Sequence, residues 1–270
     1  MSVTSKLGGL REIFAFDNKW QLIVNLLLFR KTNLIVYRLG KLEFVVDVKG
    51  GDNNGVRHTI ASRMYRELLP KSLKNSGISL LDVGANAGGF PLLLASLGIS
   101  IEKLVCVEMN PTTYNRLQFN IAQNIDCNTT CINAAVCGQR RTLCLLLGRG
   151  GTGDNIYQEH PAERNSAHRH SVRGILLDDA CEEGLKGGCD RIDLCKIDVE
   201  SAEYEIFSNS GHQCLRRCRW LVMEIHDRQN AMKTDALLAE IKNCGFVQCG
   251  CHDDVFLFEN RIGSKGQQVP

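Results

Sequence analysis

The sequence has no apolar run long enough to cross a lipid bilayer, which takes about 20 consecutive residues. Its longest apolar stretch near the start, residues 22–29, is interrupted by Asn25. Charged residues such as Arg11 and Glu12 precede that stretch, so it does not resemble a secretory signal peptide and is predicted to form an amphipathic or buried helix. We therefore expect a cytoplasmic protein with no obligatory membrane partner.

An excess of one charge sign is also missing. Lysine and arginine number 32, and aspartate and glutamate number 30, which gives a formal net charge of +2. This balance gives no reason to expect a nucleic-acid partner. The 270 residues, of which 44% are hydrophobic, suit one α/β domain with an N-terminal extension. The oligomeric state is not indicated by the composition.

The paired C-x-x-C motifs that hold structural zinc are absent, although the chain has thirteen cysteines. Cys244, Cys249 and Cys251 lie close together, but no matching second pair exists, so we expect no zinc there. Several other cysteines fall in segments predicted to be buried strands, where free thiols in a reducing compartment are the simplest account. These are Cys106, Cys131, Cys137, Cys144 and Cys195.

The segment around which the rest of the chain is organised reads LLDVGANAGGF, residues 80–90. Residues 78–83 are short, apolar and bounded, which predicts a strand buried on both faces. Gly84, Gly88 and Gly89 follow, and then residues 90–97 with helical spacing. A strand, a glycine turn and a helix begin a doubly wound α/β unit, in which the turn lets a ligand approach the backbone.

A second predicted strand, residues 103–107, ends in Glu108, nineteen residues after Gly89. An acid at this position is suited to accept hydrogen bonds from the ribose hydroxyls of a nucleoside-containing cofactor. The second glycine of the dinucleotide fingerprint G-x-G-x-x-G is missing, because Asn86 stands there. The glycine-rich residues 148–154 lack the G-K-[ST] ending of a phosphate-binding loop, so we reject that interpretation.

Three regions are expected: an N-terminal extension or cap over 1–77, a cofactor-binding domain over 78–260 and a flexible tail over 261–270. The extension is predicted to contain a helix, a β-hairpin turning at Gly40 and a second helix. Its segments are 34–39 and 42–48 for the hairpin, 50–55 for a loop and 58–69 for the second helix.

Further strands and helices are expected along the domain. Helices are predicted over 111–123 and 234–243, and the final strands should form a hairpin. The polar and basic residues 158–173 form either a solvated loop or a substrate-facing flap. The remaining predicted strands are 129–136, 141–147, 175–177, 192–197, 220–225, 246–250 and 255–259.

Acidic residues follow two of these strands, where ligands of open α/β sheets bind. Asp198 follows the strand 192–197, and Glu224 and His226 end the strand 220–225. Asp198 and His226 are the two candidates for a general base. Alternatively, Asp198 caps the following helix as a carboxylate. Glu203 is interpreted as a structural residue. A divalent ion held by Asp198, Glu200 and Glu224 is an alternative mechanism that we do not favour.

With these pieces in place, the chain resembles the FkbM family of S-adenosylmethionine-dependent methyltransferases over residues 78–260. The resemblance rests on residues 80–90 with 105–111, on LCKIDVESAEYEIF at 194–207, and on WLVMEIH at 220–226. Ser201 stands where the family usually has glycine, and a positive φ there would be strained. The resemblance implies a class I methyltransferase fold: a Rossmann-like, seven-stranded, mostly parallel sheet with helices on both faces.

The resemblance also implies S-adenosylmethionine as cofactor and assigns residues to it. Glu108 would hold the ribose, Asn133 and Ala134 would lie near the adenine, and the cofactor turn would comprise Asp82, Gly84, Asn86 and Gly88. The implied acceptor is a hydroxyl group on a sugar, glycolipid or secondary metabolite. Two rival interpretations are a nucleotide-dependent oxidoreductase and a non-catalytic binding protein with the same fold.

Overall fold

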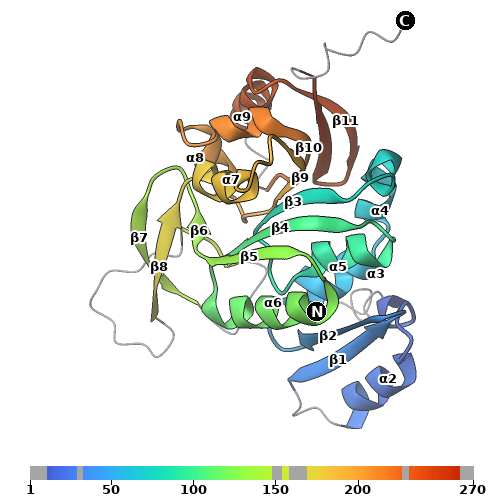
Figure 1. The fold of residues 1–270 in the computed structure, drawn as a ribbon. Coiled ribbons are helices and arrows are strands. Elements are labelled where there is room, and N and C mark those ends of the chain that lie inside the picture. Colours follow the sequence, from blue (N-terminus) through green and yellow to red (C-terminus); the bar gives the residue numbers. More distant parts are fainter. Residues whose placement is uncertain (1–10, 29–32, 148–153, 158–168, 227–230, 262–270) are drawn as a thin grey trace, which may run out of the picture.

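A seven-stranded sheet forms the centre of the molecule in the computed structural model (Figure 1). The structure describes residues 11–28, 33–147, 154–157, 169–226 and 231–261. The strand order is β11-β12-β10-β9-β3-β4-β5. The strands of this sheet are β3 (Ile78–Val83), β4 (Ile101–Glu108), β5 (Asn128–Asn133), β9 (Ile192–Ile197), β10 (Cys218–Glu224), β11 (Phe246–His252) and β12 (Val255–Asn260).

The sheet is parallel except at β12, which runs antiparallel to both β10 and β11. Strand β3 pairs with β4 on one side and β9 on the other, so that Asp82 lies opposite both Cys106 and Lys196. The polar residues that follow β3, β4, β9 and β10 therefore meet at one edge of the sheet. The predicted mostly parallel, seven-stranded sheet is confirmed.

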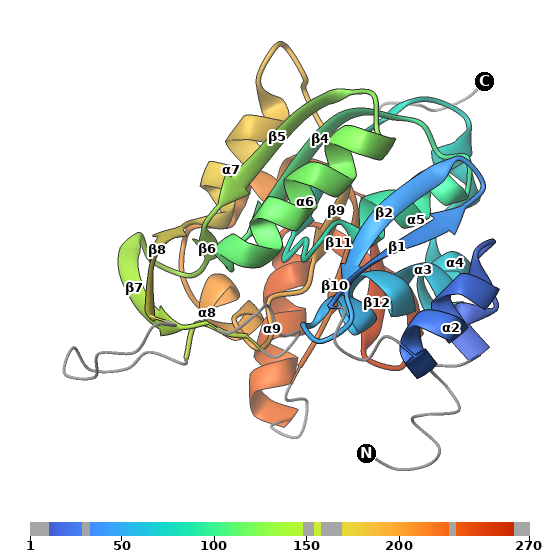
Figure 2. The ribbon, with the colours of Figure 1, turned by 90° about the horizontal axis from the view of Figure 1, so that it is seen from below.

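Helices cover both faces because alternate side chains of the strands enter two separate cores. One core contains α5 and α6, and the other contains α7 and α9; these helices can be followed in Figure 2. Leu80 of β3 packs in the first core, and its neighbour Leu81 packs in the second. All six residues of β3 are buried, as expected for a strand covered on both faces. The helices are α5 (Gly89–Ser96), α6 (Pro111–Asn124), α7 (Leu177–Leu185), α8 (Glu203–Phe207) and α9 (Ala231–Asn243).

The N-terminal residues pack on the α5 and α6 face of the sheet. They form α2 (Lys19–Leu28), the hairpin β1 (Leu34–Leu39) and β2 (Leu42–Asp47), a π-helix (Asn53–His58), α3 (Thr59–Ala61) and α4 (Met64–Leu68). The hairpin is observed where it was predicted. The single helix over 58–69 is wrong: Ser62 is extended, with ψ 154°, and separates α3 from α4. The loop over 50–55 is also partly wrong, because the π-helix begins at Asn53.

Polar side chains of α6 help to attach this N-terminal region to the domain. The buried guanidinium of Arg116 donates from Nε and Nη2 to both carboxylate oxygens of Asp52, at 2.8 Å each. The side-chain amide of Asn120 accepts from Val45 N at 2.8 Å and donates to the carbonyl oxygens of Val45 and Ala87. Asn120 thereby joins the hairpin directly to the glycine turn after β3.

Other predictions fail beyond β5. The strand expected over 129–136 is interrupted at Ala134, whose N–H donates to Glu108 O, and the chain then leaves the main sheet. Residues 169–173, expected as loop or flap, belong to a strand with alternating burial that pairs with β7. A small sheet of order β6-β8-β7 results, from β6 (Ala135–Val136), β7 (Arg141–Leu146) and β8 (Arg169–Ile175). Residues 148–153, 158–168 and 262–270, which include most of the predicted flap and tail, lie outside the described residues.

The cysteines differ from expectation in two respects. Cys181 of α7 and Cys214 form a disulfide, so the cysteines are not all free thiols. Cys106, Cys137 and Cys195 are buried as predicted, whereas Cys131 and Cys144 are only half-buried. Cys131 lies on β5, the edge strand of the main sheet, which explains its partial exposure.

Among the helices that the structure describes, none is long and apolar enough to cross a membrane.

Candidate active site

An open cavity of about 750 Å³, including solvent space at its mouth, lies at the carboxyl ends of β3, β4 and β9. The glycine turn contributes Gly84 and Asn86 to its wall, and β4 contributes Glu108. Asp198 and Glu200, which follow β9, line the same space. This is the edge at which parallel α/β sheets bind their ligands.

The glycine turn fits closely against the residues that follow β9. Gly84 has φ +76°, and a Cβ atom there would lie 1.7 Å from the carbonyl oxygen of Asp198. Asn86 also has a positive φ, 48°, and its N–H donates to Oε2 of Glu108 at 3.0 Å. Only glycine therefore fits at position 84, while the turn leaves backbone exposed to the cavity beside it.

Glu108 is a buried carboxylate that organises the turn. Its Oε1 accepts from Asn110 N at 2.7 Å, and its Oε2 from Asn86 N. Burial raises the pKa of Glu108 to about 7, and these two backbone hydrogen bonds oppose that rise. Each carboxylate oxygen keeps a second lone pair, which can accept from a ligand hydroxyl.

The other predicted cofactor residues are placed in different ways. Ala134 lines the cavity. The Asn133 side chain donates to the carbonyl oxygens of Glu108 and Met109 instead, which fixes the end of β5. Among the described residues, the cavity wall does not include Asp82 or Gly88. Gly88 is the N-cap residue before α5, with φ +92°, and a Cβ atom there would press on Leu117 and Ile121.

Lys196, which also lines the cavity, lies between two carboxylates. Its Nζ is 3.1 Å from Oδ2 of Asp198 and 3.6 Å from Oδ1 of Asp82. Burial alone would lower the pKa of Lys196, but the two carboxylates outweigh burial and raise that pKa well above 10.5. Asp82 is fully buried and its oxygens have no hydrogen-bond partner, so burial raises its pKa to about 6 despite Lys196. Asp82 thus acts on the site through Lys196.

His226 follows β10 and is surrounded by acids. Its Nδ1 lies 2.8 Å from Oε1 of Glu203, which is completely buried. Its Nε2 lies 3.5 Å from Glu200, 3.6 Å from Glu224 and 3.9 Å from Asp198. The two predicted base candidates, Asp198 and His226, are therefore neighbours, and Glu203 orients the imidazole.

These contacts shift the proton affinities of the site. Burial lowers the pKa of His226, but the hydrogen bond and charge of Glu203, followed by Glu200 and Asp198, raise it to about 9. Burial raises the pKa of Glu200 to about 7, a rise that the charge of His226 opposes. At neutral pH the imidazole is therefore charged, while the Glu200 carboxyl group exchanges its proton readily.

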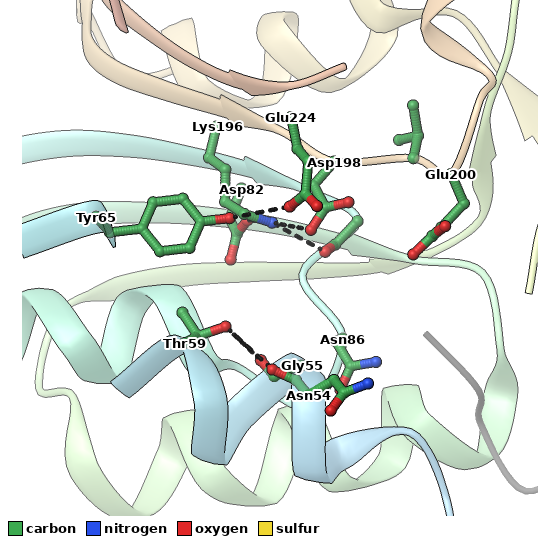
Figure 3. Close-up of polar contacts among 12 residues, drawn as sticks. Asn54, Gly55, Thr59, Tyr65, Asp82, Asn86, Lys196, Asp198, Glu200 and Glu224 are labelled. Atoms are coloured by element: carbon green, nitrogen blue, oxygen red, sulfur yellow. Dashed lines mark hydrogen bonds and ion pairs between the residues drawn. The ribbon is translucent and has the colours of Figure 1, made fainter. Parts of the chain in front are cut away.

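The N-terminal region also reaches this site (Figure 3). Gly55 and Thr59 line the cavity, opposite Asp198 and Glu200. The Tyr65 hydroxyl donates to Oε2 of Glu224 at 3.4 Å, and its ring packs edge-on against Phe90.

The sequence matches the family model described as the methyltransferase FkbM domain over residues 82–247, more than half of the chain. The chain belongs to the FkbM methyltransferase family. This membership decides for a methyltransferase over the rival oxidoreductase. The strand order agrees with this membership. The matched span contains the glycine turn, Glu108, Asp198 and His226.

Comparison with individual proteins gives partial similarities. The AMB antimetabolite synthetase AmbE of Pseudomonas aeruginosa is 35% identical over 96 residues, which is 34% of this chain and 4% of AmbE. The FkbM methyltransferase structure from Methylobacillus flagellatus has 13% identity and a TM-score of 0.43, covering 68% of this chain and 43% of that one. TYW2 of P. horikoshii, in complex with MeSAdo, has 10% identity and a TM-score of 0.41, covering 84% and 69%. The chain thus spans under half the length of the first two.

A metal ion has candidate ligands in this FkbM-family site. Ligand atoms of Asp198, Glu224 and His226 lie within 4.8 Å of one another. The predicted alternative set contained Glu200 in place of His226. Lys196 and the charged imidazole already pair with these carboxylates, so the residues themselves supply the positive charge that a metal would bring.

Two interactions at the site were not identified from the sequence. Tyr65 lies 159 residues before Glu224, so no local pattern connects them. Asp82 and Lys196 lie opposite each other across β3 and β9, and no local pattern predicts which strands become neighbours.

Proposed function

We propose that the protein is an S-adenosylmethionine-dependent methyltransferase that methylates a hydroxyl group of a small molecule. One observation carries the proposal. The glycine turn, Glu108 and the carboxylates Asp198 and Glu200 all line a single cavity. A cofactor held by the glycine turn and Glu108 would therefore lie in the same cavity as carboxylates that are able to accept a proton.

The cavity wall suits this cofactor chemically. Val107, Met109, Ala134 and Ile156 give an apolar surface on which an adenine ring can pack, and Glu108 lies beside them with free lone pairs for a ribose. Excess negative charge at the strand ends complements a cofactor that carries a sulfonium and an ammonium group. The bound cofactor would supply a methyl group on a good leaving group.

Glu200 is the proposed general base. A neutral hydroxyl is a weak acid, so transfer of its proton to a positioned base assists the reaction. Glu200 lines the cavity, its side chain is 30% exposed, and burial raises its pKa to about 7, close to the working pH of most enzymes. His226, charged at neutral pH, would hold the Glu200 carboxylate in place across 3.5 Å.

Asp198 has the complementary proposed role of orienting the acceptor. It lines the cavity, and Lys196 lies 3.1 Å from its Oδ2 and fixes the direction of the carboxylate. Its Oδ1 is available to accept a hydrogen bond from a substrate hydroxyl. Alignment of this kind contributes to catalysis by holding the reacting atoms together.

The acceptor class is proposed from relatives. The resemblance to FkbM methyltransferases implies hydroxyl groups of sugars, glycolipids or secondary metabolites. The partial match to AmbE, whose name describes an antimetabolite synthetase, agrees with a small-molecule acceptor. The balanced charge of the chain agrees as well, because nucleic-acid binding relies on concentrated positive charge.

Calorimetric titration with S-adenosylhomocysteine, with NAD as a parallel control, tests the cofactor. We expect saturable binding of S-adenosylhomocysteine alone. Glu108→Ala should weaken it by roughly 10-fold or more, since a hydrogen bond to a charged group contributes about 1.5–3 kcal/mol. The exposed Asp253→Asn should not change it. Absence of binding to the wild-type protein, or equal affinity in Glu108→Ala, would contradict the assignment.

Transfer of tritiated methyl groups to a panel of sugars, glycolipids, hydroxylated metabolites and RNA tests the acceptor. We expect label in a hydroxylated small molecule and none in RNA. Glu200→Gln should leave S-adenosylhomocysteine affinity intact and lower kcat by roughly 10²–10⁴-fold, as expected for loss of a general base. Labelled RNA, or full activity of Glu200→Gln, would refute the proposed acceptor or the proposed base respectively.

A further inference from the structure

A second group of metal-binding side chains lies away from the cavity, where α9 meets the segment before the 3-10 helix Gln213–Arg217. It consists of His212, Glu240 and Cys244, whose ligand atoms lie within 4.8 Å of one another. None of these residues lines the cofactor cavity. The methyltransferase mechanism proposed above does not use them.

The ring of His212 is oriented as in a metal ligand. The side chain is 98% buried, because only 2% of its surface is exposed. Its Nδ1 lies 3.2 Å from the carbonyl oxygen of Ile206, so this nitrogen carries the proton and donates it. Its Nε2 then points to Oε1 of Glu240 at 3.1 Å. When the ring is neutral, Nε2 of His212 is an acceptor, and so is Oε1 of Glu240. Only a proton or a metal cation can therefore lie between these two atoms.

Metal-binding histidines usually donate their second ring nitrogen to a carbonyl or carboxylate, as His212 does. In a tetrahedral zinc site, nitrogen and oxygen ligands at about 2.0–2.2 Å from the metal are about 3.4 Å apart. The observed separation of 3.1 Å needs only a small adjustment to reach this value.

The remaining two donors come from one helical face. Glu240 and Cys244 are four residues apart, and Cys244 N donates to Glu240 O at 3.0 Å, which continues the helical turn beyond the end of α9. Asn243 Nδ2 donates to Oε2 of Glu240 at 3.0 Å and leaves Oε1 directed at His212. The Cys244 thiol is buried. One helix end therefore supplies an oxygen and a sulfur ligand in fixed positions.

The opposite side of the group is also held firmly. Asp178 at the start of α7 donates its N–H to Gly211 O, and its Oδ1 accepts from Cys214 N at 2.8 Å. Cys214, two residues after His212, forms the disulfide with Cys181 of α7. The imidazole is therefore presented to α9 by a segment that is tied to α7 on both sides.

We propose that His212 Nε2, Glu240 Oε1 and Cys244 Sγ bind a zinc ion that joins α9 to this segment. Nitrogen, oxygen and sulfur donors together suit zinc, and three protein ligands leave the fourth position to solvent. Binding replaces the proton of the Cys244 thiol, which is released to solvent, so the ion binds the thiolate. The Glu240 side chain is 32% exposed and lines an open surface cavity with Tyr204 and Leu237, which gives the ion a path of entry.

Cobalt(II) is the probe for the test, because cobalt bound by a thiolate absorbs in the near ultraviolet through charge transfer. The purified full chain is titrated with cobalt in oxygen-free buffer without a reductant, so that the Cys181–Cys214 disulfide stays intact, and zinc is then added in competition. We expect a charge-transfer band that saturates at one equivalent and is displaced by zinc. Cys244→Ser should lose the band. Cys249→Ser, which changes an exposed cysteine on β11, should keep it.

Two further variants locate the ion and guard against misfolding. Glu224→Gln should keep the band, which separates this group from the three donors near the cavity. If Cys244→Ser does not fold, Asn243→Ala decides, because loss of a residue that orients a ligand should weaken affinity roughly 10-fold or more. An unchanged band in folded Cys244→Ser, unchanged affinity in Asn243→Ala, or no saturable band in the wild-type chain would overturn the proposal.

Discussion

His226 Nδ1 lies 2.8 Å from Oε1 of Glu203, a carboxylate with no exposed surface. Burial opposes the charged imidazole, but the hydrogen bond from Glu203 raises the pKa of His226 to about 9. Glu203→Gln keeps the shape and removes the charge, so we predict that the pKa of His226 falls by at least one unit, or about 1.4 kcal/mol. Proton NMR titration of the imidazole measures it, with Asp253→Asn as control. An unchanged pKa would mean that Glu203 is not the main partner.

The activity should follow a bell-shaped dependence on pH. Glu200 must lose its proton to act as a base, so kcat/KM should rise as the pH passes through about 7. His226 loses its proton, and with it its positive charge, as the pH passes through about 9, so the rate should fall above that value. Steady-state kinetics with the methyl acceptor measures both limbs. In Glu203→Gln the alkaline limb should move to lower pH, and an unmoved limb would argue against His226 as its origin.

Gly84 and Gly98 provide a matched pair for testing the cofactor turn. Both have positive φ, 76° and 73°, so alanine at either costs roughly 1–2 kcal/mol of backbone strain. At Gly98 the new Cβ meets nothing within 4 Å, whereas at Gly84 it overlaps the carbonyl oxygen of Asp198. Gly84→Ala should therefore lose roughly 1–3 kcal/mol more in the free energy of unfolding, together with S-adenosylhomocysteine binding. Denaturant unfolding that gives equal losses for both would refute the overlap.

Ser201 should carry measurable backbone strain. A positive φ was expected to strain this serine, and its φ is +76°. Glu200 before it has φ +50°. Ser201→Gly and Ser201→Ala both remove the hydroxyl, but only alanine keeps the Cβ atom. We predict that the glycine variant is more stable by about 1 kcal/mol, as measured by denaturant unfolding. Equal stability would show that the positive φ is not strained here.

The central strands were predictable because their residues are buried on both faces and the pattern is local. The run at 78–83 and the run at 192–197 coincide with β3 and β9. Their carboxyl ends had to meet in a parallel sheet, so the proximity of Glu108 and Asp198 to the glycine turn followed from topology alone. These predictions needed no knowledge of long-range packing.

Other features depend on contacts that the local sequence does not contain. Ser62 divides the expected helix over 58–69, although the apolar spacing continues through it. The strand after β4 ends early because the Asn133 side chain and Ala134 N both bind carbonyl oxygens near Glu108. The polarity of 169–173 suggested a loop, but β7 offers it a pairing partner. In the last two cases a tertiary hydrogen bond or a strand pairing overrides the local pattern.

The proton affinities of the site belong to the same category. From residue type alone, His226 was a natural candidate for the base, since an isolated imidazole titrates near neutral pH. Four surrounding acids reverse that expectation and make it a cation. Glu200, a residue that the sequence offered as a ligand of a metal ion, is the general base that we propose instead.

The hydrogen bonds of Asn120 bear on how the protein unfolds. For Val45 this one side chain satisfies both the N–H and the C=O, as a neighbouring strand would, while it also holds Ala87 of the cofactor turn. Loosening the hairpin therefore releases the turn, and the two should open in hydrogen exchange as one cooperative unit. A chain shortened to begin at residue 78 would lose the partner of Arg116 as well. The hairpin and Asp52 are then part of what makes the turn rigid, and ligand binding at the turn should slow exchange at Val45.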